Sequence, residues 1–282
     1  MSFTANDVKT LREKTNVGMM DCKKALEEAK GDMELAVEVL RKRGLSVAQK
    51  KAGRTASEGI LGTYSDDNGK LACMVEINCE TDFVVRTDDF QNFVSKITKI
   101  VKEQGPKDME GLLKLSFNEK ETVQDALTLL IAKIGENIQL KRFVRWEAGS
   151  NEKVGCYVHA GSKIGVLTVL QDASGKVTSD SAKEVSMHIA AMNPRYIRRD
   201  EVPATVVEKE KEIQRATVDT KKPAEIQNKI IEGKLNRFFS EVCLEEQAFV
   251  KDPEGKKTVG GWLKEISPTA KIEKFVRLQV GA

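Results

Sequence analysis

Two histidines are the residues of this chain best suited to acid-base or metal chemistry. Neither His159 nor His188 lies in a metal-ligand pattern of Cys, Asp or Glu, and no GxSxG or HExxH motif occurs. His188 belongs to the segment SMHIAAM, on an apolar helical face where a hydrogen-bonded structural histidine is the commoner case. The sequence therefore predicts no metal site and no catalytic residue.

A phosphate-binding loop is the second chemistry to consider. The segment EGKKT at 254–258 is similar to a Walker loop, but GKK replaces GK[ST], and Val250 stands where the leading Gly belongs. Binding of a nucleotide through such a loop is not expected, and no cofactor is predicted. An effect on a nucleotide would have to pass through another protein.

Exposed apolar side chains would indicate contacts with such a protein. Asp82 and Phe83 place an acid beside an aromatic ring just after an apolar run. In the alternative interpretation, Thr81 or Asp82 caps a turn and Phe83 enters the core, which is the usual location of a Phe. Met19 and Met20 raise the same question: one can face a core, so the other is expected to be an exposed, adaptable contact residue.

The cysteines form an odd, scattered set without a CxxC pair, which indicates neither a disulfide framework nor a zinc site. We expect them to be reduced and mostly half-buried. They are Cys22, Cys73, Cys79, Cys156 and Cys243.

Composition limits the class of protein. The 46 basic and 43 acidic residues give a net charge of +3, so direct nucleic-acid binding is not expected, and the mixed surface is typical of a protein that binds other proteins. The longest apolar stretches are far shorter than the roughly 20 residues that span a bilayer, so no membrane segment is expected. The N-terminus has no apolar signal core, which favours a cytoplasmic location.

The first 45 residues predict a module of three short helices. A cap at Thr4 to Asp7 begins the first helix, the second runs from about Met19 to Ala29, and the third follows a cap at Asp32 and ends at Gly44. Small and basic residues at 46–58 then predict a linker, helical at most in its first half. Its cations could touch RNA or an acidic partner, but a solvated linker is the simpler interpretation.

An internal repeat organises the rest of the chain. The segments 64–71 and 157–164 share Tyr, Lys and an aliphatic residue in the same places, and Gly62 or Gly155 lies two residues before each. Each copy predicts a strand, a turn containing Gly, and a returning strand, followed by a helix. Further strands are predicted at 138–144, 242–250 and 275–280. The fold class is therefore α+β, with core subdomains at 59–149 and at 150–200 joined to 237–282, each built on a small antiparallel sheet.

An insertion at 201–236 interrupts the second subdomain. Val206 and Ile213 lie seven residues apart on one segment, and Ile226 and Ile230 lie four apart on the next. This pattern predicts a helical hairpin with a turn at 221–223. Its narrow apolar stripe calls for a partner.

Taken together, these segments resemble the elongation factor Ts family over nearly the whole chain, from Leu11 to about Gly281. The most specific segments are LREKT-x-x-GMMDCKKAL at 11–26, TDFV at 81–84, KIGENI at 133–138, YVHAGSKIGVL at 157–167 and MHIAA at 187–191. The resemblance implies a ubiquitin-associated-like N-terminal module, a two-subdomain core and a coiled-coil insertion. It also implies guanine nucleotide exchange on the GTPase elongation factor Tu, without bond-making chemistry, so the protein is not expected to be an enzyme.

The resemblance further implies roles for individual residues. Thr81, Asp82, Phe83 and Val84 would wedge between helices near the magnesium site of the GTPase. Another helix of the same domain would be contacted by Arg12, Met19 and Met20, and the third domain of the GTPase by His159. The hairpin would support a homodimer or a 2:2 complex. Many family members continue into a further helical module after the strand at 275–280, so contacts made by that module are not expected here.

Two alternatives stay open at the level of sequence. An RNA- or ribosome-associated protein that uses the three-helix module and the basic linker would show steep salt dependence and would tolerate changes at Asp82 and Phe83. A thiol or metal enzyme built on Cys73, Cys79 and His159 would bind a metal or show thiolate reactivity.

Overall fold

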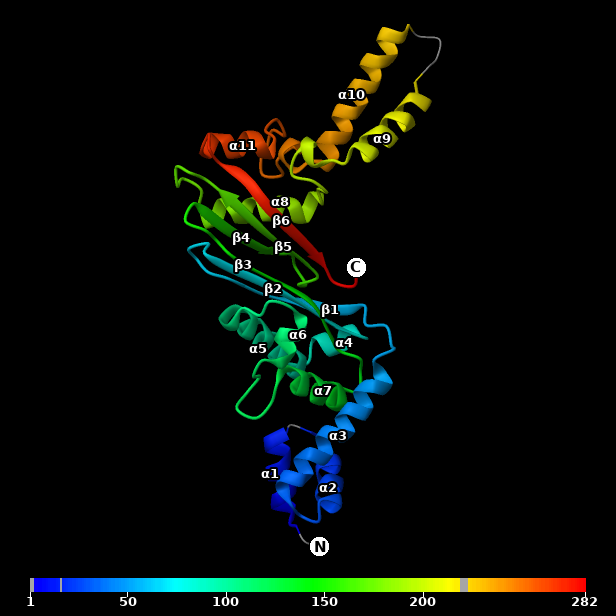
Figure 1. The fold of residues 1–282 in the computed structure, drawn as a ribbon, viewed down its shortest axis with the longest axis vertical. Coiled ribbons are helices and arrows are strands. Elements are labelled where there is room, and N and C mark those ends of the chain that lie inside the picture. Colours follow the sequence, from blue (N-terminus) through cyan, green and yellow to red (C-terminus); the bar gives the residue numbers. More distant parts are fainter. Residues whose placement is uncertain (1–2, 16, 219–222) are drawn as a thin grey trace.

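A computed structural model of the chain describes residues 3–15, 17–218 and 223–282. Figure 1 shows an elongated molecule, with the N-terminal helices at one end, two stacked sheets in the middle and a helical hairpin projecting from the other end. The mixture of helices with small antiparallel sheets confirms the α+β class. Among the described residues, no helix is both long enough and apolar enough to cross a membrane.

Three helices form the N-terminal end, as the sequence predicts. The first has a capping box, in which the Thr4 N–H and hydroxyl donate to the Asp7 carboxylate and the Asp7 N–H donates to the Thr4 hydroxyl. At the third, the Asp32 carboxylate accepts two backbone N–H groups, each at 2.9 Å. The helices are α1 (Ala5–Thr15), α2 (Met19–Glu28) and α3 (Met33–Lys51).

The predicted end of the third helix at Gly44 is wrong, because α3 continues to Lys51 and takes in the first part of the segment predicted as a linker. Gly44 is buried against α7 (Val123–Ile134), where an added Cβ would lie 3.4 Å from Thr128 Cγ2. The residue is therefore a close-packing point between two helices and not a helix terminator.

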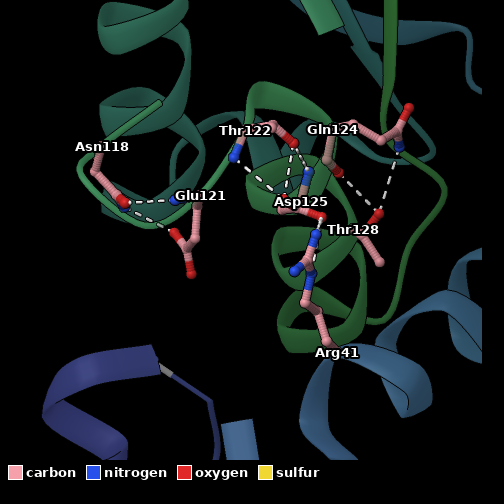
Figure 2. Close-up of polar contacts among 7 residues, drawn as sticks. All are labelled: Arg41, Asn118, Glu121, Thr122, Gln124, Asp125 and Thr128. Carbon is pink, nitrogen blue, oxygen red and sulfur yellow. Dashed lines mark hydrogen bonds and ion pairs between the residues drawn. The ribbon is translucent and has the colours of Figure 1, made fainter. Parts of the chain in front are cut away.

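An ion pair holds the same two helices together. Figure 2 shows the Arg41 guanidinium of α3 reaching the Asp125 carboxylate near the start of α7, with Nε donating to Oδ1 at 2.9 Å. Asp125 also completes a capping box with Thr122. The pKa of Asp125 lies below its ordinary value, because hydrogen bonds from Arg41 and Thr122 outweigh the opposing effect of burial.

Two three-stranded antiparallel sheets form the centre of the molecule, in the orders β1-β2-β3 and β4-β5-β6. Each has one register shift, at Glu76/Ile77 in the first and at Val169/Leu170 in the second. The strands are β1 (Glu58–Ser65), β2 (Leu71–Cys79), β3 (Gln139–Glu147), β4 (Glu152–Val158), β5 (Ile164–Gln171) and β6 (Lys271–Gln279).

The strand predicted at 242–250 is wrong. Helix α10 (Ala224–Val242) runs past residue 236 into this segment and is followed by a short 3₁₀ helix, Leu244–Glu246. Cys243 makes one isolated bridge to Tyr196. Four apolar residues of the segment are buried: Val242 and Cys243 lie at the base of the hairpin, and Leu244 and Phe249 lie in the second core. Their run reflects burial on several sides and not the pleat of a strand.

Helices cover the outer face of each sheet. Gly62 of β1 lies beneath α5 (Asp88–Gln104), and Gly155 of β4 lies beneath α8 (Ser179–Met192), where an added Cβ would meet the backbone of Ala182 at 2.2 Å. Both glycines, which the sequence pairs, therefore permit a helix to cross a strand closely. The division into the predicted domains itself stays a prediction. The remaining core helices are α4 (Asp82–Val85), α5 (Asp88–Gln104), α6 (Met109–Lys114), α8 (Ser179–Met192) and α11 (Val259–Ile266).

The inserted hairpin consists of α9 (Ala204–Ala216) and α10, which project away from the sheets in Figure 1. Ile213 and Ile226 of its apolar stripe are 49% and 47% exposed. The predicted turn at 221–223 falls mostly outside the described residues. The predicted self-contact through this stripe stays a prediction.

A buried carboxylate ties the end of β5 to the loop before β6. Asp172 is only 1% exposed and accepts hydrogen bonds from the hydroxyls of Ser174, Ser267 and Thr269 and from backbone N–H groups. Burial opposes ionisation, but the hydrogen bonds outweigh it and hold the pKa of Asp172 well below its ordinary value.

Replacing Gly155 by Ala should destabilise the fold by about 3 kcal/mol or more, because the new methyl group overlaps the backbone of α8 and not a flexible side chain. Gly233→Ala is the matched control: nothing lies near its Cβ position in α10, so this change should stabilise by about 0.5 to 1 kcal/mol. Urea unfolding of the two variants measures both values, and equal effects would contradict the packing argument.

The pH dependence of stability should reveal Asp172. A carboxyl whose pKa is lowered on folding stabilises the protein above its unfolded pKa of about 3.9 and loses this contribution as the pH falls toward its folded pKa. Asp172→Asn should therefore lower Tm near neutral pH, and the difference from wild type should shrink below about pH 4. Asp67→Asn, at an exposed carboxylate, is the control in thermal melts across this range. A Tm difference that does not change with pH would contradict the assignment.

Candidate functional site

The segment 81–84 forms the corner at which the chain passes from β2 into α4: Thr81 is the N-cap residue, and Asp82, Phe83 and Val84 are the first residues of the helix. Within it, neighbouring side chains face opposite ways. Phe83 is 76% exposed, whereas Val84 is 7% exposed and packs in the core of the first sheet. The interpretation in which Phe83 enters the core is therefore wrong. An exposed aromatic ring on a fixed corner is a feature typical of contact sites.

Thr81 is half-buried and is held in place by hydrogen bonds to another loop. Its hydroxyl donates to Glu136 Oε1 at 2.7 Å, and its backbone N–H donates to Glu136 Oε2 at 3.0 Å. The N–H of Glu80 donates to the same Oε2 at 3.1 Å, and Cys79 Sγ donates to the Thr81 carbonyl. One carboxylate thus satisfies three donors of the corner.

Glu80 extends in the opposite direction. The N–H of Asn137 donates to Glu80 Oε1 at 2.7 Å, and Arg54 approaches Oε2 at 3.5 Å. The pKa of Glu80 lies below its ordinary value, mainly because of the Asn137 N–H. The two loops 80–81 and 136–137 therefore each accept backbone hydrogen bonds from the other.

At the corner, Asp82 is exposed to solvent like Phe83. Its only ion pair within the described chain is with Arg86, at 3.4 Å between two exposed side chains. Such pairs contribute about 0 to 1 kcal/mol, so the carboxylate is available to a partner.

The N-terminal candidates lie on α1 and α2. Met19 and Met20 are 43% and 62% exposed, so both are exposed where the sequence led us to expect one. The inner face of α2 is formed by Cys22, Ala25 and Leu26 instead. Arg12 is exposed on α1.

His159 lies exposed at the turn between β4 and β5. Its Nδ1 is 3.1 Å from the Tyr157 hydroxyl, and the turn is attached to β1 because the Leu61 N–H donates to the Ser162 carbonyl at 2.8 Å. Lys163 forms an ion pair with Glu58 at the start of the same strand. Since Glu58 pairs with Cys79, this turn borders the half of β1 that lies beside the end of β2, and the 81–84 corner follows that end of β2.

The remaining candidates for chemistry are structural. His188 is fully buried, receives the Val250 N–H at Nδ1 and contacts Gln247 Oε1 through Nε2, as predicted for a structural histidine. Burial lowers its pKa. No group of His, Cys, Asp and Glu that could hold a metal ion occurs among the described residues.

The cysteines are free, and the expectation that most are half-buried is wrong, because only Cys156 is partly exposed. Burial raises the pKa of Cys73 to about 11 and that of Cys79 to about 12, so neither supplies a thiolate near neutral pH. These values argue against the interpretation as a thiol enzyme.

Comparison with known proteins identifies the family. Residues 80–282 match the family model described as Elongation factor TS. Among the similar proteins are the elongation factors Ts of Clostridium botulinum (44% identical over 285 residues) and Clostridium perfringens (46% over 285 residues). That of Nautilia profundicola is 46% identical over 288 residues, and each alignment covers 99% of this chain and 93% of the relative. The chain belongs to the elongation factor Ts family.

Membership in the elongation factor Ts family makes elongation during protein biosynthesis the process that this chain serves. Glu136 lies within the segment KIGENI, and its role at the corner was not predicted from the sequence. The hint available in sequence was the position of this acid directly after Gly135, which ends α7 in the left-handed region with φ 80°.

Neighbouring substitutions in this family member should separate surface from core at the corner. Phe83→Ala should change the free energy of unfolding by at most about 0.5 kcal/mol, because the ring is mostly exposed. Val84→Ala should cost about 2 kcal/mol, because it removes buried methyl groups. Denaturant unfolding measures both, and a large loss for Phe83→Ala would contradict the exposed placement of its ring.

Proposed function

We propose that this chain binds the GDP form of elongation factor Tu and promotes release of GDP, after which GTP can rebind. The observation that carries the proposal is Phe83, 76% exposed beside the exposed Asp82 on a corner held by partly buried hydrogen bonds. In this proposal Asp82 and Phe83 insert near the magnesium and phosphate site of the GTPase.

The physical properties of the corner suit insertion into a partner. An aromatic ring provides a large contact area at low conformational cost, and such rings are frequent among residues that dominate binding energy. Because Thr81 and Val84 are fixed within the chain, little ordering of the corner is needed on binding. Thr81 and Val84 would then support the contact, and Asp82 and Phe83 would make it.

Exchange of this kind needs no bond-making residue. If binding of the factor weakens binding of GDP, then GDP must weaken binding of the factor by the same ratio. The chemistry required is therefore differential contact, which exposed side chains on rigid elements can supply. Among the described residues, no group of His, Cys, Asp and Glu could hold a metal ion, and the cysteines are free.

Two further contact regions belong to the proposal. Arg12, Met19 and Met20 would bind another helix of the same GTPase domain, and the exposed methionines give an adaptable apolar surface there. His159 would contact the third domain of the GTPase from its turn beside β1.

The RNA-binding alternative finds less support in the geometry. Arg54 of the basic segment forms an ion pair with Glu80, and Lys50 and Lys51 belong to the last turn of α3. The RNA-binding alternative also assigns no role to the exposed ring of Phe83.

The test is release of a fluorescent GDP analogue from elongation factor Tu with and without this protein. Wild type should accelerate release strongly, and Phe83→Ala and Asp82→Ala should each reduce the acceleration by about tenfold or more, the loss expected for a central contact worth about 1.4 kcal/mol or more. Val250→Ala, which truncates an apolar side chain that is 46% exposed and follows Phe249 of the second core, is the matched control and should retain full activity.

Absence of acceleration by wild type would overturn the exchange proposal. Full activity of both corner variants would instead show that the corner does not contribute to binding of the GTPase. The N-terminal surface would then be the main contact. Binding that weakens steeply with salt, with RNA as ligand, would favour the alternative.

A further inference from the structure

We infer that Glu136 and Asn137 form a joint that positions the 81–84 corner and the end of α3 relative to one another. The inference rests on the proposed function, since these two elements lead to its two main contact surfaces. Neither residue is exposed in the manner of Phe83: Glu136 is half-buried and Asn137 is 3% exposed. Both are positioning residues, acting through the segments that they hold.

The corner side of the joint is formed by the Glu136 carboxylate. It accepts the N–H groups of Glu80 and Thr81 on Oε2 and the Thr81 hydroxyl on Oε1, at 2.7 to 3.1 Å. These donors immediately precede α4, whose first turn carries Asp82 and Phe83. Removing the carboxylate would leave three partly buried donors without this acceptor and would free the direction in which α4 departs.

The other side of the joint is formed by Asn137. Its side-chain amide donates to the Arg54 carbonyl at 2.7 Å and to the carbonyl of Ala52, the C-cap residue of α3, at 3.5 Å. Its backbone N–H donates to Glu80 at 2.7 Å. Adjacent residues thus bind the corner and the segment that directly follows α3.

Helix α7 carries this joint and also the docking site of α3. Arg41 and Gly44 contact Asp125 and Thr128 on α7, and the joint follows directly after its end at Ile134. The N-terminal helices and the corner are therefore both positioned by α7. Small displacements between two contact surfaces can cost a large factor in rate, up to about 100-fold for 1 Å.

The chemistry of the Glu136 contacts separates positioning from direct binding. A glutamine at this position can accept both N–H groups on its carbonyl oxygen and donate its amide to the Thr81 hydroxyl, which can accept. Glu136→Gln should therefore keep the corner in place without the charge. Glu136→Ala removes every contact.

The first experiment is a double-mutant cycle in the nucleotide release assay, with full-length protein at saturating concentration. Glu136→Ala should slow release about tenfold or more, whereas Glu136→Gln should stay within about twofold of wild type. In the Phe83→Ala background, Glu136→Ala should have less than about a twofold further effect, because it acts through the same ring. Glu119→Ala, which removes an exposed carboxylate, is the matched control.

Hydrogen exchange of the free protein supplies a readout independent of activity. The amides of Glu80 and Thr81 should exchange about tenfold faster or more in Glu136→Ala and remain protected in Glu136→Gln. Asn137→Ala keeps its backbone N–H, so protection of these two amides should persist. Its effect on release should be non-additive with Met20→Ala, because it acts through the N-terminal surface.

Several outcomes would overturn the inference. Loss of activity in Glu136→Gln equal to that in Glu136→Ala would show that the charge itself contacts the partner. Additive effects of Glu136→Ala and Phe83→Ala, or of Asn137→Ala and Met20→Ala, would show independent action. Unchanged amide exchange in Glu136→Ala would refute the joint directly. If wild type does not accelerate release, the proposed function fails, but amide exchange still decides whether Glu136 holds the corner.

Discussion

The packing of the two sheets against each other is the interaction on which the arrangement of the surface depends. Leu61 and Met74 of the first sheet and Leu167 of the second belong to one buried cluster between them. At its border the buried carboxylate of Glu76 accepts the Arg142 Nε at 2.7 Å, and Arg142 also reaches the Gln279 carbonyl in β6. A buried charge needs such a partner, so this pair fixes how the sheets meet at β3 and β6.

That packing brings distant parts of the sequence to one end of β1. The 159–163 turn binds β1 through Leu61 and Glu58, β2 returns beside it to the 81–84 corner, and the end of α3 leads into its first residue. No single element carries the three predicted contact regions. Their relative positions depend on the register of β1 and β2, on the ion pair between Lys163 and Glu58, and on the packing of α3 against α7.

Periodicity and caps were sufficient for much of the fold, because these signals act within a few residues. Capping at Thr4 and Asp32, the paired glycines Gly62 and Gly155, and the returning strands were all readable from the sequence. The failures involve tertiary context. Gly44 is a terminator by local rules and a packing residue because of α7. The buried residues of 242–250 pack against the base of the hairpin and the second core, and local rules do not show how these parts meet.

The candidate site shows the same division between residue type and environment. Phe83 and Met20 could be named from sequence as contact residues, but their exposure is set by which neighbours fill the core, here Val84 and Cys22. Glu136 could not be given a role, because a carboxylate 55 residues away from Thr81 shows no pattern with it. A factor that works by differential contact depends on the relative positions of its contact surfaces. The residues that determine its activity therefore include those that hold the contacting side chains in place. Such residues become visible only when the hydrogen bonds between loops are known.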